Sequence, residues 1–109
     1  MIMTQSDIFT YRVARGETVT LSVALTGLPP NVVKVSKAMQ PVAGRPLTWS
    51  LTVPDKGKKV FNVVMEISFV SAPASAVITI EGDQGGSFSL PPITENSPDK
   101  DPGFTFRVK

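Results

Sequence analysis

Apolar and polar residues alternate with a period of two through most of the chain, and this constrains the fold more than any other feature. The clearest example is segment 47–53, whose apolar members are Leu47, Trp49, Leu51 and Val53. Such alternation is typical of a strand with one face on the core and the other in solvent. No segment shows the helical period of 3.6 residues together with caps. The chain is therefore predicted to be all-β.

Seven to eight strands are expected, separated by turns rich in glycine and proline. The expected strands cover residues 7–14, 18–26, 32–37, 47–53, 59–70, 76–81, 87–90 and 104–108. Short strands at a spacing of roughly 8–12 residues indicate an antiparallel sandwich of two sheets or a barrel, and the sandwich is preferred. A length of 109 residues suits one domain, which is expected to span the whole chain.

The chain resembles the immunoglobulin-like and fibronectin-type sandwiches. The resemblance rests on the expected strand number, on Trp49 in phase with the core positions, and on the lack of helical segments. The resemblance is one of architecture and extends over the whole chain. It carries no function with it, because folds of this kind support many unrelated functions.

The composition excludes several kinds of chemistry. The chain has no cysteine and no histidine, so disulfides, thiolate metal sites and a Ser-His-Asp triad are all excluded. No motif joins a nucleophile to a base, and the chain is expected not to be an enzyme and to use no cofactor. If carboxylates did act in catalysis, the candidates would be Glu66, Glu81, Asp83 and the loop 95–101. A carboxylate pair must face one cleft, which a sequence does not reveal.

An oxygen-rich loop is the only metal-like feature. Its members are Glu95, Asn96, Asp99 and Asp101. Calcium prefers such ligands, but the spacing differs from that of an EF-hand loop, so a solvated acidic loop is preferred and no metal is expected.

Location and charge limit the partners. Residues 1–7 lack a basic segment followed by an apolar one, so no signal peptide is visible, and a full-length chain would be expected in the cytoplasm. No apolar run approaches the ~20 residues of a membrane helix. The net charge of +2 gives no support for nucleic-acid binding. Residues 1–59 carry eight basic and three acidic side chains, whereas residues 60–109 carry three and six. This asymmetry either polarises the surface and steers a partner, or disappears once the strands interleave.

The aromatic residues leave a carbohydrate-binding module as an alternative function. Trp49 alternates in phase with core positions and is expected to be a core anchor. An exposed stacking platform would then have to come from the remaining candidates, which are Phe9, Tyr11, Phe88 and Phe104.

The preferred function is a non-enzymatic module for protein binding or assembly, with this chain or another protein as its partner. The outward face of segment 59–70 is more apolar than a solvated face requires. The interface residues expected there are Val60, Val64, Glu66 and Val70. Either the stretch 91–103 folds back over them, or a second subunit covers them in a homodimer. In a subunit contact, Glu66 would need a basic partner, which Lys34 or Lys37 would supply.

Overall fold

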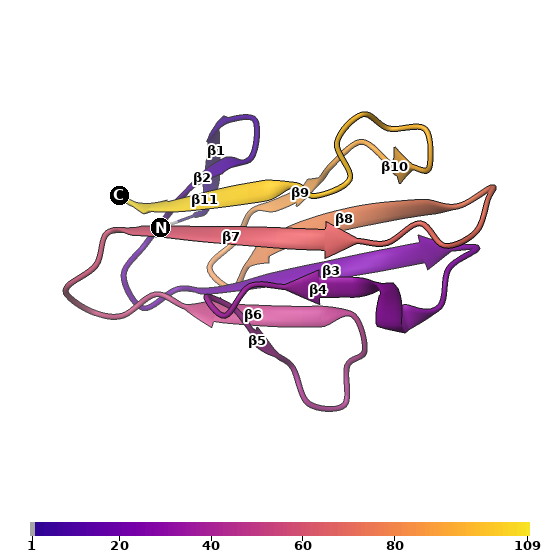
Figure 1. Ribbon diagram of the computed structural model, residues 1–109. Helices are drawn as coiled ribbons and strands as arrows, with labels where there is room; N and C mark the ends of the chain where they lie inside the picture. The colour runs from indigo at the N-terminus through magenta and orange to yellow at the C-terminus, as the bar shows by residue number, and fades with distance from the viewer. Residues whose placement is uncertain (1) are drawn as a thin grey trace.

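The computed structural model describes residues 2–109 and shows two open sheets packed over one hydrophobic core (Figure 1). The described residues form eleven strands, one 3-10 turn at Pro30–Val32 and no α-helix. The expectation of an all-β chain with two sheets is therefore confirmed.

The first sheet has the strand order β1-β2-β11-β7-β4. Its strands are β1 (Thr4–Asp7), β2 (Thr10–Val13), β11 (Gly103–Val108), β7 (Val60–Ile67) and β4 (Val33–Val35). Neighbouring strands are antiparallel except for β2 and β11, which run parallel, so the two ends of the chain lie side by side in the middle of this sheet.

The second sheet has the order β10-β8-β3-β6-β5, with β9 also paired to β8. Its strands are β3 (Thr18–Thr26), β5 (Gln40–Pro41), β6 (Thr48–Thr52), β8 (Ser75–Gly82), β9 (Ser87–Ser89) and β10 (Ile93–Thr94). All of its pairings are antiparallel. The short strands β5 and β10 form its two opposite edges, and this places the loops beside them on opposite sides of the molecule.

Three strands escape the sequence pattern, so the expected count of seven to eight is too low. The expected strand 7–14 contains only β2 and the turn before it, and the pattern misses β1. At this turn Phe9 adopts a φ of +62° and the Asp7 carboxylate accepts a hydrogen bond from the Ile8 amide. Strands β5 and β10 have two residues each and lie within stretches expected to be loops. Alternation cannot be recognised in segments this short.

The core contains large side chains from both sheets. Tyr11, Phe104 and Phe106 are each at most 1% exposed, and the rings of Tyr11 and Phe106 stack with centroids 5.8 Å apart. Phe9 and Phe88 pack on these rings, at 5.6 Å from Phe104 and 5.4 Å from Tyr11. Adjacent aromatic rings in such geometry add to the stabilisation gained from burying their area.

Burial of Tyr11 leads to a prediction about alkaline pH. Desolvation raises the pKa of its phenol above the ordinary value of 10.0. Below about pH 10 the phenol is neutral in both states, but above that pH it ionises first in the unfolded chain. The free energy of unfolding should therefore fall as the pH rises above 10, and it should fall less in Tyr11→Phe. Tyr11 is the only tyrosine, so phenolate absorbance reports it alone; a midpoint at or below pH 10 in the folded protein would contradict its burial.

Candidate functional site

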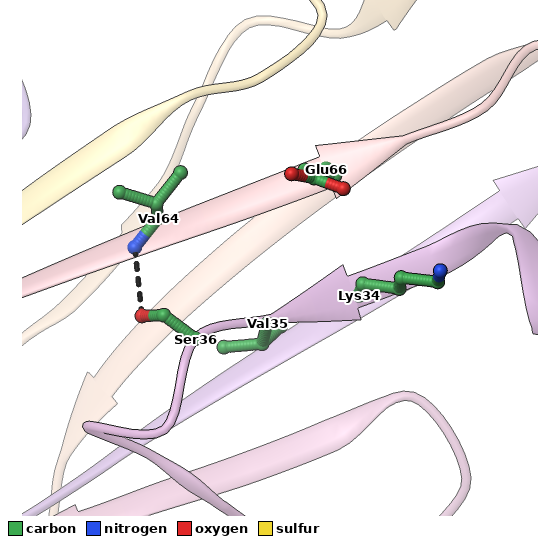
Figure 2. A pocket seen from close by; sticks show the side chains of 5 residues that line it. All are labelled: Lys34, Val35, Ser36, Val64 and Glu66. Atoms are coloured by element: carbon green, nitrogen blue, oxygen red, sulfur yellow. Dashed lines mark hydrogen bonds between the residues drawn. The ribbon is translucent and has the colours of Figure 1, made fainter.

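A shallow hollow of about 240 Å³ lies on the outer surface of the first sheet, where β4 meets β7. Figure 2 shows the five side chains that line it, which are Lys34, Val35, Ser36, Val64 and Glu66. The sequence singled out Val64 and Glu66, and the structure places them together here with Lys34.

Small neighbours explain the hollow around Val64. On one side, Val64 is opposite Gly103 of β11, which has no side chain. On the other side lies Ser36, whose hydroxyl accepts a hydrogen bond of 3.0 Å from the Val64 amide (Figure 2). Because neither neighbour covers it, the Val64 side chain remains 50% exposed.

Strand β4 is an edge strand. The residues that hydrogen-bond to β7 show which of its backbone amides and carbonyls point away from the sheet. The Ser36 amide donates to Val64 O at 2.9 Å, and the Ser68 amide donates to Val32 O at 3.1 Å. Backbone groups of alternate residues point to opposite sides of a strand. The groups of Val33 and Val35 therefore point away from β7, and no other strand of residues 2–109 lies beyond β4. Such an edge can pair with another strand.

Two residues of unlike charge lie opposite each other beside the hollow. Lys34 and Glu66 are register partners on β4 and β7, and both side chains are exposed. Directly opposite residues of unlike charge stabilise an antiparallel pair. Glu66 therefore has a basic neighbour in its own chain, and this neighbour is one of the two expected from the sequence.

The stretch 91–103 does not fold over this surface, although its last two residues run beside β7, where Pro102 O accepts a hydrogen bond of 2.9 Å from the Met65 amide. Its strand β10 pairs with β8 in the second sheet, and the Glu95 carboxylate accepts a hydrogen bond of 3.2 Å from the Ala74 amide. Of the two coverings considered for Val64, the intramolecular one is therefore not formed.

The other two expected interface residues lie apart from the hollow. Val60 is only partly exposed, opposite Arg107 on β11. Val70 is 68% exposed, but it lies beyond the end of β7 at Ile67. There the Val70 amide donates to Ser68 O at 3.1 Å and not to a neighbouring strand.

The aromatic candidates do not form an exposed platform. Tyr11 and Phe104 are buried, while Phe9 and Phe88 are partly buried against them. Trp49 differs from its expected role as a buried anchor. It packs on the core but is only partly buried, because β6 has just the two-residue β5 beyond it at this edge.

The acidic candidates are not gathered around one cleft. Glu66 is exposed on β7 of the first sheet, whereas Glu81 is exposed on β8 of the second. Asp83 accepts a hydrogen bond of 3.0 Å from the Thr18 amide. In the loop 95–101, Asp99 accepts one from the Asp101 amide at 2.9 Å. No group of three or more acidic side chains among the described residues is arranged to hold a metal ion.

One buried carboxylate was not singled out from the sequence. Glu17 has no exposed surface, although it occupies a turn. One carboxylate oxygen accepts a hydrogen bond of 2.9 Å from the Ala14 amide, and the other has no hydrogen-bond partner among residues 2–109. A Cβ at Gly82 would overlap that second oxygen, so the carboxylate fits against a residue without a side chain. Turn residues are usually exposed, so nothing in the sequence pattern signals this burial.

Comparison with known proteins identifies no family for this chain. No family model, curated protein or solved structure matches it. Within residues 2–109 there is also no helix long and apolar enough to cross a membrane.

Proposed function

We propose that this chain is a non-enzymatic assembly module that pairs with a second copy of itself along the free edge of β4. The observation that carries the proposal is the outward-facing backbone of Val33 and Val35, directly beside the half-exposed Val64. Strand addition at a sheet edge takes its affinity from main-chain hydrogen bonds and its specificity from neighbouring side chains.

The charge pattern of β4 supports a symmetric antiparallel contact centred on Val35. In that register Val35 is opposite Val35 of the second copy, and the two residues exchange their backbone hydrogen bonds. Lys34 is then opposite Ser36 of the second copy, so the two lysines do not oppose each other. A contact in which both subunits use the same patch is the commonest form of homodimer.

The proposed contact also extends the apolar surface at Val64. Both copies carry Val64 on the outer face, one strand in from the joined edges. Because β4 has only three residues, few hydrogen bonds form, and we expect association in the micromolar range or weaker.

We also propose that the two sheets are of the immunoglobulin-like type. In that type, one sheet joins the first, second, fifth and fourth strands, and the other joins the third, sixth and seventh. The neighbours β4, β7 and β11 correspond to the second group, and β3, β6 and β5 to most of the first. Strand β8 would occupy the place of the first strand beside β3, as an insertion between β7 and β11.

Sedimentation equilibrium on three proteins tests the β4 contact. The wild type should associate at high micromolar concentration, and Val35→Pro, which loses the β4 contact, should associate at least about tenfold more weakly. Proline removes the outward amide of residue 35 but none of the hydrogen bonds from β4 to β7. Val35→Ala is the matched control, because it loses the same packing and keeps the amide, and it should still dimerise. A monomeric wild type, or a Val35→Pro variant that dimerises as tightly, would overturn the proposal.

A further inference from the structure

A second hollow, of about 450 Å³, lies at the β5 edge of the second sheet. Its lining includes Trp49, Pro41, Pro46, Leu47 and Arg45. Val42, Gly44 and Thr48 complete the lining, so it is mainly apolar and Arg45 is its single charged side chain. Trp and Arg are the residues most often found to dominate protein contacts.

Three backbone hydrogen bonds constrain the loop that carries this hollow. The Val42 amide donates to Thr48 O at 2.9 Å and closes the loop, and the Arg45 amide donates to Val42 O at 3.2 Å within it. The Val23 amide donates to Leu47 O at 3.0 Å and fixes the loop to β3. Leu47 has a φ of +55°, a strained conformation for a residue with a side chain. A site fixed in this way binds at a smaller entropic cost.

The hollow favours an occupant that is both apolar and anionic. The guanidinium of Arg45 is exposed and has no hydrogen-bond or ion-pair partner among residues 2–109, and no acidic residue lines the hollow. Aromatic-lined grooves accept proline rings, which lose little conformational entropy on binding. An exposed proline next to a carboxylate meets both requirements.

The same chain carries such a segment at the opposite edge of the same sheet. The loop after β10 exposes Pro98, Asp99 and Asp101. Strand β10 is at one end of the sheet order and β5 is at the other, so this loop does not reach the hollow of its own molecule. Figure 1 shows the two loops projecting on opposite sides.

We infer that the acidic proline loop of one copy docks into the Trp49 hollow of the next. Pro98 lies against the indole, and the carboxylates of Asp99 and Asp101 face Arg45. The contact joins two different surfaces, so it is head-to-tail and continues into a ring or an open chain of subunits. It brings a basic residue of the first part of the chain against acidic residues of the second part, in line with the uneven charge of the sequence. It does not depend on the β4 contact.

A charge-exchange experiment on the full chain tests this inference. All proteins carry Val35→Pro, so that association at β4 does not contribute. Arg45→Glu makes the hollow anionic. Asp99→Asn with Asp101→Lys makes the loop basic and keeps an acceptor oxygen at residue 99 for the turn. In sedimentation velocity the Val35→Pro parent should associate, and each charge variant alone should associate at least about tenfold more weakly.

Mixing the two charge variants is the decisive step. In the mixture, the acidic loop of one variant meets Arg45 of the other, and the basic loop meets the anionic hollow, so association should return to within a few-fold of the parent. Trp49 is the only tryptophan, so its fluorescence should change with the same concentration dependence. Lys56→Glu changes the net charge as Arg45→Glu does, at an exposed turn away from the hollow, and should leave association unchanged. A parent that stays monomeric, or a mixture no tighter than its components, would overturn the inference, and circular dichroism confirms that each variant is folded.

Discussion

Replacing Phe106 with alanine should lower the free energy of unfolding by about 3–5 kcal/mol, the range typical of a large aromatic removed from a core. Phe106 has no exposed surface. It lies on β11, between β2 and β7, and its ring stacks on Tyr11. The substitution leaves a cavity at the centre of the first sheet, and it also removes a contact of the only tyrosine.

Urea denaturation followed by circular dichroism measures this loss. Phe69→Ala is the matched control, because the same ring is removed from a partly exposed position beyond the end of β7. Its cost should be clearly smaller. Equal costs for the two variants would mean that Phe106 does not occupy the core position described.

Gly86→Ala should cost about 2–5 kcal/mol, because two unfavourable effects combine. Gly86 has a φ of +95°, which an L-residue adopts only with strain, and a Cβ there would overlap the carbonyl oxygen of Met3. The Met3 side chain is buried in the core, and its amide donates to Gly85 O at 3.1 Å. The N-terminal segment is therefore held against this turn and has little room to move away.

Gly57→Ala separates the two effects. Gly57 has nearly the same φ, +94°, but a Cβ there meets nothing within 4 Å. Gly57→Ala should therefore lower the free energy of unfolding only by the backbone strain, about 1–2 kcal/mol. The difference between the two variants, measured by thermal or urea unfolding, isolates the contact with Met3. A Gly86→Ala variant as stable as Gly57→Ala would show that the N-terminal segment does not pack there.

The long strands were accessible from the sequence because each spans several alternations. The expected segment 18–26 coincides with β3, and 47–53 differs from β6 by one residue at each end. The misplaced boundaries have local causes. Segment 59–70 keeps its alternation after β7 ends at Ile67, so the pattern does not mark this end, and no glycine or proline lies between Ile67 and Val70. Phe9 turns the chain at a positive φ that a β-forming aromatic residue gives no reason to expect.

The candidate sites could be predicted only in part, because a one-dimensional pattern does not show which strand is an edge. Val64 and Glu66 were predicted as interface residues because the outward face of segment 59–70 is unusually apolar. The hollow around Val64 depends on Gly103 and Ser36, which are distant in sequence. Trp49 is in phase with the core as expected. It is only partly buried because β6 lies next to the edge of its sheet, which follows from the sheet order and not from its own segment.

Amide hydrogen exchange at Val35, measured by NMR at low and high protein concentration, tests the central claim most directly. The Val35 amide points away from β7, so it should exchange rapidly in dilute protein and slow down as the concentration rises and the β4 edges pair. The Lys34 amide faces β7 in the same strand and is the internal control, with protection at both concentrations. Val35 exchange that stays rapid at every concentration, while Lys34 remains protected, would contradict assembly through β4.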